Sequence, residues 1–246
     1  MGLKNFDTFI FDLDGTLWKY PEICEGAEKI WKKLQDMNKN LVIVSNFTFV
    51  DRDEILKKLE KGGIKIEKEK LITSGYVAAL LFKNKRVFPI GIGLKKELEK
   101  NGVIISDKKV DAVVIGHDTK FNYWKAAHAL KLLREGAKLY VTSLGKIWNY
   151  KNDYLPGTGL IIKGIEYCSN KKAIMLGKPS KYIVNVTKKF LKGKVVHFGD
   201  EIKADSEFAK HIGAKFVFIR SGADKNVKKV KAYMILNSIK DIAKLL

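Results

Sequence analysis

The sequence predicts an α/β fold in which a parallel sheet is wound by crossover helices. Two observations lead to this prediction. Apolar runs rich in β-branched and aromatic residues occur without polar interruption, as expected for strands that are buried on both faces. Between these runs lie segments with apolar residues at helical spacing, and alternation of strand and helix is typical of sheets wound by crossover connections.

Five apolar runs predict the strands, and four segments predict the main helices. The strands are Phe9–Phe11, Leu41–Val44, Val113–Ile115, Val195–Val196 and Phe216–Ile219. The helices carry their periodic apolar residues over Ala27–Leu34, Ile55–Leu59, Ala126–Leu133 and Ile183–Leu191. Gly62, Gly63 and Gly136 stand where the second and third helices should end, because glycine readily adopts the left-handed conformation that closes a helix.

The length and composition are those of an ordinary globular protein. The 246 residues, 46% of them hydrophobic, suffice for one large domain or for a core with a smaller second domain. No clear linker divides the chain, although Gly75 and the pair Ser169 and Asn170 are plausible points at which it crosses between domains.

The early part of the chain does not look like a targeting segment. Asp7, Asp12 and Asp14 interrupt it, and no later stretch has the roughly 18 consecutive apolar residues of a membrane span. We therefore expect a cytoplasmic protein. Cys24 and Cys168 lack a C-x-x-C partner, so two reduced thiols are expected rather than a disulfide or a zinc site.

The formal net charge of +20 raises the question of a polyanionic partner. Only four of the 47 basic residues are arginines, whereas base readout and phosphate forks favour the planar guanidinium group. The lysines also recur along every predicted helix instead of gathering in one tail. We therefore expect a solvated lysine surface without dedicated nucleic-acid binding, whose field attracts small phosphorylated molecules.

Polar residues suited to phosphate chemistry follow three of these apolar runs and a fourth, shorter apolar stretch, Ala173–Leu176. They are Asp12 and Asp14, Ser45 and Asn46, Lys178, and Asp200 with Asp205. In open α/β sheets the ligand site lies beyond the carboxyl ends of the strands, so these residues are expected to converge. Carboxylates, a hydroxyl and an ammonium group together suit a phosphate bound with Mg²⁺, which takes oxygen ligands. Each residue alone could serve a turn or a helix cap, but all four positions at strand ends favour a site.

The sequence does not match other common binding or catalytic motifs. An EF-hand loop beginning at Asp12 would need Glu at its twelfth position, which is Ile23. A dinucleotide loop beginning at Gly91 would need a third glycine where Lys96 stands, and no P-loop or Ser-His-Asp hydrolase set is evident.

These motifs resemble those of the haloacid dehalogenase (HAD) superfamily of aspartate-nucleophile phosphohydrolases. The D-x-D-G-T motif spans Asp12–Thr16, Ser45 and Lys178 follow in order, and G-D-x₄-D spans Gly199–Asp205. The long stretch between Ser45 and Lys178 is similar to the large α/β cap of the NagD and 4-nitrophenylphosphatase branch. The resemblance thus implies a Rossmann-like core formed by residues 1–76 and 174–246, with an inserted C2-type cap at 77–173.

The resemblance also implies a role for each motif residue. Asp12 attacks phosphorus to form an aspartyl-phosphate, and Asp14 protonates the leaving alcohol and then activates water. Asp12, the backbone carbonyl of Asp14 and Asp200 hold Mg²⁺. Ser45, Asn46 and Lys178 bind the phosphate, and Asp205 orients Lys178 or a water on the metal.

The sequence departs from the pattern of the branch at several positions. Phe47 replaces a common asparagine, Glu201 replaces an arginine, and Lys203 replaces an acid.

Three further residues belong to this comparison. Asp118 matches a substrate-facing aspartate of the cap. For His117 we favour a packing or surface role over reading the leaving group, and we expect His197 to lie in the core.

The leading functional hypothesis is a Mg²⁺-dependent phosphatase of small phosphorylated metabolites. A phosphotransferase would use the same core residues, and a catalytically silent, basic nucleic-acid-binding or scaffold protein on the same fold is the alternative from another class. The sequence does not distinguish a sugar phosphate, phosphoglycolate, pyridoxal phosphate or a nucleotide as substrate. Caps of this type often contribute to dimers, so a homodimer is one expectation.

Overall fold

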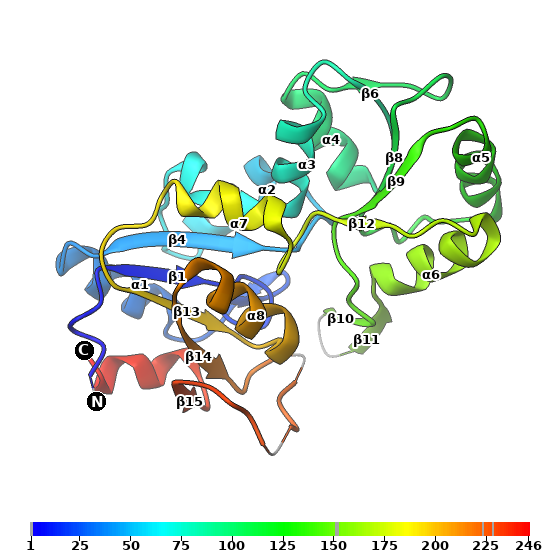
Figure 1. Ribbon diagram of the computed structural model, residues 1–246. Helices are drawn as coiled ribbons and strands as arrows, with labels where there is room; N and C mark the ends of the chain where they lie inside the picture. Colours follow the sequence, from blue (N-terminus) through cyan, green and yellow to red (C-terminus); the bar gives the residue numbers. More distant parts are fainter. Residues whose placement is uncertain (1, 151–152, 223, 228) are drawn as a thin grey trace.

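Two parallel sheets form two lobes that lie side by side (Figure 1). The computed structural model describes residues 2–150, 153–222, 224–227 and 229–246. The first lobe contains a six-stranded sheet in the order β15-β14-β13-β1-β4-β5. Its strands are β1 (Thr8–Phe11), β4 (Asn40–Ser45), β5 (Leu71–Thr73), β13 (Val195–Gly199), β14 (Lys215–Ile219) and β15 (Met234–Leu236).

Helices cover both faces of this sheet, because successive residues of its buried strands point to opposite sides. Phe9 and Phe11 of β1 pack with Trp31 on the face of α1 (Ala27–Asp36), α2 (Arg52–Lys61) and the short helix η2 (Ile239–Lys244). Ile10 of the same strand packs with Phe208 on the face of α7 (Lys181–Lys188) and α8 (Ile202–Ile212). The remaining elements of this part are β2 (Trp18–Lys19), β3 (Glu22–Ile23) and η1 (Lys68–Lys70).

The second lobe contains a five-stranded parallel sheet in the order β12-β9-β8-β6-β7. Its strands are β6 (Arg86–Ile90), β7 (Ile104–Ile105), β8 (Ala112–Ile115), β9 (Lys138–Val141) and β12 (Ile174–Met175). Helices α5 (Tyr123–Arg134) and α6 (Thr158–Ser169) cover one face, whereas α3 (Ser74–Leu81) and α4 (Ile92–Lys100) cover the other. An antiparallel hairpin of β10 (Ile147–Tyr150) and β11 (Asp153–Pro156) projects from this lobe toward the first.

The sequence predicted the fold class and the main elements correctly. All five apolar runs lie in strands of the two parallel sheets, and α1, α2, α5 and α7 occupy the four predicted helical segments. Gly62 is the C-cap of α2, and Gly136 follows the end of α5 with φ +108°. The predicted periodicity overran one helix, because α7 ends at Lys188 and Leu191 packs from the following loop.

The chain passes between the lobes near the predicted crossing points. Gly75 lies in α3, directly after the last strand of the first sheet that precedes the second lobe. Ser169 ends α6, and Ile174–Met175 then adds β12 to the second sheet before the chain returns. The division into a discontinuous core and an inserted cap stays a prediction, and strand membership extends the second sheet two residues past position 173.

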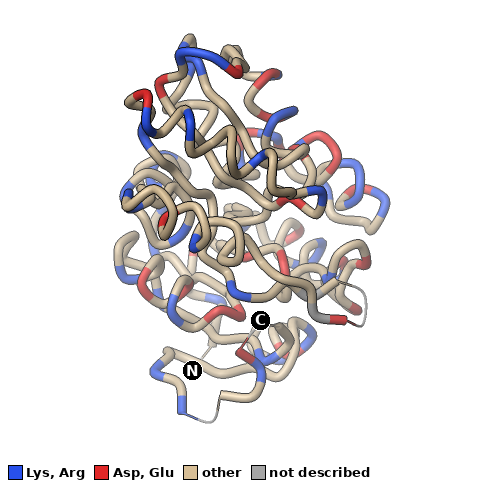
Figure 2. The backbone as a smooth tube through the Cα atoms, turned by 90° about the vertical axis from the view of Figure 1, so that its right-hand side faces the viewer, with Lys and Arg blue, Asp and Glu red and all other residues tan. Residues whose placement is uncertain are grey.

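The surface carries its charges on many elements. Lys and Arg are spread over both lobes in Figure 2, in line with the predicted lysine surface. In the part of the chain that the structure describes, no helix has the length and apolar character needed to cross a membrane.

Candidate active site

The carboxyl ends of β1, β4 and β13 meet on one side of the first sheet, where open parallel sheets bind their ligands. A cavity of about 650 Å³ lies between these strand ends and the second lobe. Its lining includes Asp12, Asp14, Ser45, Asn46, Lys178 and Asp200 from the predicted set. Residues separated by up to 188 positions in the chain therefore border the same space, as the sequence predicted.

Lys178 is the buried centre of the site. Its Nζ donates to Asp12 Oδ1 and to Asp205 Oδ1, each at 2.6 Å, and the lysine is only 2% exposed. Burial alone would lower the pKa of Lys178, but the two carboxylates outweigh it and raise the pKa above its ordinary value. The ammonium group therefore stays charged beside Asp12.

Asp205 holds Lys178 in position through further buried contacts. Its Oδ1 also lies 2.9 Å from His197 Nε2, and its Oδ2 accepts the backbone N–H of Glu201 at 3.0 Å. Burial would raise the pKa of Asp205, but Lys178 and His197 outweigh it and lower the pKa. His197 lies in the core as predicted, but its contact with Asp205 had no signal in the sequence.

Asn46 binds the backbone of Lys178. Its Oδ1 accepts the backbone N–H of Lys178 at 2.7 Å, and its Nδ2 donates to the Lys178 carbonyl at 3.2 Å. Gly177 makes this approach feasible, since a Cβ there would collide with the Asn46 amide. The contacts give Asn46 a positioning role, and its role in phosphate binding stays a prediction. Ser45 is buried beside it, and its Oγ accepts the N–H of Phe47 at 3.1 Å.

Asp14 lies in an environment that favours its protonated form. Burial, followed by the charge of Asp12, raises the pKa of Asp14 to about 7. The backbone N–H of Tyr20, and after it the indole N–H groups of Trp18 and Trp148, oppose this increase in pKa, although neither indole forms a hydrogen bond of ordinary geometry. Asp14 Oδ1 likewise has no such partner among the described residues. Because buried polar atoms nearly always have partners, substrate or water is expected here.

Three carboxylates offer oxygens to one small region. Ligand atoms of Asp12, Asp200 and Asp205 lie within 4.8 Å of one another, and all three side chains are buried. Gly15 lets Asp200 approach, because it adopts φ +83° and a Cβ there would meet the Asp200 carboxylate. Burial raises the pKa of Asp12 although Lys178 opposes the shift, and a cation would favour its ionised form.

The donor set therefore fits a hard cation. Asp12 and Asp200 are the better candidates for ligands, because both oxygens of Asp205 already accept hydrogen bonds from the protein.

The two residues of the second lobe that the sequence singles out, His117 and Asp118, lie in different surroundings. His117 lines the cavity and packs against Trp148, with ring centroids 4.2 Å apart, and burial lowers its pKa to about 4. This contact agrees with the packing role favoured for it. The Asp118 carboxylate instead binds Lys125 Nζ at 2.7 Å and the N–H of Lys120 at 2.8 Å. A substrate-facing role for Asp118 stays a prediction that this ion pair does not favour.

Nothing in the sequence indicates the wall of the cavity that the second lobe contributes. Hairpin residue Trp148 packs into the core cluster of the first lobe, with its ring centroid 4.9 Å from that of Phe49 and 6.1 Å from that of Phe47. Lys146 and Thr158 also line the cavity. These residues belong to no motif, and only the tertiary fold brings them to the strand ends.

Comparison with known proteins agrees with this architecture. Residues 9–104 match the pattern of a haloacid dehalogenase-like hydrolase. The chain is 28% identical over 253 residues to phosphoglycolate phosphatase 1A, chloroplastic, of Arabidopsis thaliana, covering 89% of this chain and 70% of that protein. It is 27% identical to 4-nitrophenylphosphatase of Schizosaccharomyces pombe, covering 85% of this chain and 81% of that protein.

Solved structures extend the similarity to nearly the whole chain. A p-nitrophenyl phosphatase from Archaeoglobus fulgidus superposes with a TM-score of 0.89 at 26% identity, covering 98% of this chain and 99% of that chain. A 4-nitrophenylphosphatase from Thermotoga maritima gives a TM-score of 0.87 at 26% identity, covering 98% and 97%.

Proposed function

The chain is a haloacid dehalogenase-like hydrolase, and from this premise we propose that it hydrolyses phosphate monoesters of small metabolites through an aspartyl-phosphate on Asp12. The observation that carries the proposal is the position of Lys178 Nζ, 2.6 Å from Asp12 Oδ1, in a cavity that also exposes Asp14 and Asp200. Relatives named for phosphatase activity on small substrates support the same reaction class.

In the first step, an Asp12 oxygen forms a bond to phosphorus while the bond from phosphorus to the ester oxygen breaks. Lys178 and the Ser45 hydroxyl are placed to stabilise the charge on the transferring group. Asp14 gives its proton to the departing alcohol, for which its raised pKa is suited.

In the second step, Asp14 is ionised and takes a proton from water, whose oxygen attacks phosphorus. The bond between phosphorus and Asp12 then breaks, which releases phosphate and restores the carboxylate. Asp205 keeps Lys178 in place throughout, because its Oδ1 accepts from the ammonium group at 2.6 Å. Two displacements thus replace one very slow direct attack on the ester.

We propose Mg²⁺ as the cofactor, held by Asp12, Asp200 and the backbone carbonyl of Asp14. Their oxygens are the ligand type that Mg²⁺ prefers. When bound, the ion offsets the negative charges of nucleophile and phosphate and favours ionised Asp12.

Hydrolysis of 4-nitrophenyl phosphate, with and without EDTA, tests the proposal. We expect activity that EDTA removes and added Mg²⁺ restores, and no activity above background for Asp12→Asn. Undiminished turnover by this variant would refute the proposal. Analysis of products with an added alcohol separates hydrolysis from phosphoryl transfer, since a transferase would yield a new phosphate ester. A cytoplasmic location and a homodimer remain predictions.

A further inference from the structure

The walls of the cavity differ in charge. The core wall carries the acids of the proposed reaction together with Glu201 and Asp224. The wall from the second lobe consists, among the described lining residues, of His117, Ser143–Trp148, Gly157, Thr158 and Met175. That wall contains no acid, and its one charged residue is Lys146. A leaving group placed against it therefore meets only positive charge.

The lysines of the cavity also differ in their partners. Lys178 is held between two carboxylates, as described above. Lys146 and Lys203 line the same cavity, and neither ammonium group has an ion-pair or hydrogen-bond partner within the described part of the chain. Charge attraction from these two lysines is thus available to a ligand.

Helix α6 adds a second source of positive potential beside Lys146. This helix has 12 residues and begins at Thr158, after an N-cap glycine that offers no side-chain acceptor. The dipole of a helix N-terminus and its unpaired N–H groups favour an anion. In the first turn of α6, Gly159 and Leu160 N–H donate to the carbonyls of Gly145 and Gly157, so the N–H that stays available, among the described residues, is that of Thr158. The backbone connects the two features directly, because Gly157 N–H donates to the Lys146 carbonyl at 2.9 Å.

Thr158 gives an independent indication of a ligand at this place. The residue lines the cavity but is only 4% exposed. Over the described ranges, neither its hydroxyl nor its backbone N–H has a hydrogen-bond partner. Both groups are therefore available as donors, and an anion in the cavity would accept from them.

We propose that Lys146 and the α6 N-terminus at Gly157–Thr158 bind a second anionic group on the leaving portion of the substrate, with Lys203 adding charge from the core wall. The inference rests on the proposed function and narrows its substrate class. Preferred substrates are small phosphomonoesters whose leaving group carries a carboxylate or a second phosphate. The reacting phosphate occupies the region of Asp12, Ser45 and Lys178, and the second anion lies against the opposite wall.

Matched substrates test this assignment. Phosphoglycolate is compared with ethyl phosphate, which lacks the carboxylate, and propanediol bisphosphate with propyl phosphate, which lacks the second phosphate. We expect the wild-type protein to prefer the charged member of at least one pair by roughly tenfold or more in kcat/KM, mostly through a lower KM, because a charged hydrogen bond made in both ground and transition states changes binding. The pair that shows the preference identifies the anion.

Three variants locate the preference. Lys146→Met should reduce it by about tenfold and Thr158→Val by a few-fold, since each removes donors to the anion. Lys210→Met is the matched control, because it removes an equal charge from an exposed position at the far end of α8. Equal kcat/KM for both members of each pair in the wild-type protein, or an equal loss in Lys210→Met and Lys146→Met, would overturn the assignment.

Two further measurements separate this inference from the proposed function. Hydrolysis of 4-nitrophenyl phosphate by the wild-type protein tests the proposed function alone. Calorimetric titration of Asp12→Asn in Mg²⁺ with phosphoglycolate and ethyl phosphate measures binding without turnover. Phosphoglycolate is expected to bind more tightly than ethyl phosphate. The same titration compares propanediol bisphosphate with propyl phosphate. Equal binding within both pairs would contradict the second-anion site, whatever the outcome for turnover.

Discussion

At the scale of single residues, the contacts of Asp205 hold the Lys178 ammonium group next to the Asp12 carboxylate. Asp205 accepts from Lys178, His197 and the Glu201 backbone, so both of its oxygens are engaged. Burial makes each of these contacts stronger, and the loss of any one more costly, than it would be in water. The geometry of the nucleophile and its lysine therefore depends on a histidine that does not line the cavity.

We expect His197→Phe to lower kcat by roughly tenfold with little change in KM, because Asp205 loses a buried donor worth about 1.5 to 3 kcal/mol and Lys178 loses its fixed position. Steady-state kinetics with 4-nitrophenyl phosphate measure this. His197→Asn, which retains an N–H donor, should recover part of kcat, whereas a purely structural role would leave kcat per folded molecule unchanged in both variants.

The raised pKa of Asp14 predicts a pH dependence that differs between substrates. A carboxyl with a pKa of about 7 is protonated below that pH and loses its proton as the pH rises through it. The acid form is needed for a poor leaving group such as an alkoxide but hardly for nitrophenolate. The ratio of kcat/KM for glycerol phosphate to that for 4-nitrophenyl phosphate should therefore fall above about pH 7.

Because the alkyl and aryl phosphates ionise at different pH values, each kcat/KM is first expressed per dianion with the separately titrated pKa of that substrate, and the ratio is taken afterwards. Profiles measured from pH 5 to 9 check the prediction. Asp14→Asn should reduce the hydrolysis of glycerol phosphate by a larger factor than the hydrolysis of 4-nitrophenyl phosphate. Parallel profiles for the two esters in the wild-type protein would show that Asp14 is not the acid.

Most residues of the site could be predicted from the sequence, but the residues that hold them in position could not. Asp12, Ser45, Lys178 and Asp200 were found because each follows an apolar strand or belongs to a short motif. The contact between His197 and Asp205 could not be found, because a histidine inside a strand gives no sign of what it faces. These supports depend on packing between the strands and α8, which local pattern does not encode.

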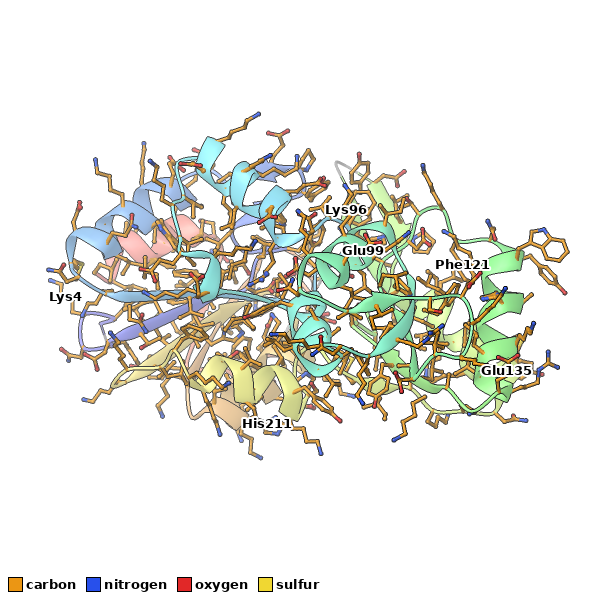
Figure 3. All side chains as sticks on the ribbon, turned by 90° about the horizontal axis from the view of Figure 1, so that it is seen from above. Lys4, Lys96, Glu99, Phe121, Glu135 and His211 are labelled. Carbon is orange, nitrogen blue, oxygen red and sulfur yellow. The ribbon has the colours of Figure 1, made fainter. Side chains whose placement is uncertain are left out.

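At the scale of elements, α2 of the first lobe and α4 of the second are joined by a buried ion pair. Arg52 Nε donates to Glu97 Oε1 at 2.7 Å, and its backbone N–H donates to Glu97 Oε2 at 2.8 Å. The guanidinium also lies 3.5 Å from the ring centre of Tyr76 in α3. More exposed pairs surround this one, such as Lys96 with Glu54 at 2.8 Å, and Figure 3 labels Lys96 on α4 where the lobes meet.

Glu97→Ala should lower the free energy of unfolding by roughly 3 to 5 kcal/mol, because it leaves the buried Arg52 charge without a carboxylate, although the Lys68 carbonyl and the Tyr76 ring stay beside it. Glu54→Gln is the control and should cost less than about 1 kcal/mol, since exposed pairs contribute little. Urea unfolding measures both. Similar values for the two variants would contradict the importance of burial at this junction.

Elements with strong local periodicity were predictable, whereas their pairing was not. The strands β1 and β4 were evident because they are buried on both faces. The sequence could not assign β12 to the second sheet, since Ile174–Met175 is too short to show a pattern. Nor could it dock Trp148 against Phe49, because that contact joins segments far apart in the chain and arises only from the fold.

At the scale of the whole molecule, two lobes enclose a cavity lined by a cluster of acids, in a chain whose formal net charge is +20. In the proposed function, the positive surface attracts phosphorylated substrates from a distance, and the buried carboxylates carry out the reaction. Lysines are spread over both lobes (Figure 2), and the lack of dedicated nucleic-acid binding stays a prediction. The central claim is that this arrangement transfers phosphate to one carboxylate before water removes it.

Rapid acid quench of the Mg²⁺-loaded protein with substrate labelled at phosphorus tests this claim most directly. The account predicts transient label on the protein, in an acid-stable and base-labile linkage that mass spectrometry places on Asp12, and none in Asp12→Asn. Label at another residue, or turnover by Asp12→Asn at the wild-type rate, would contradict it.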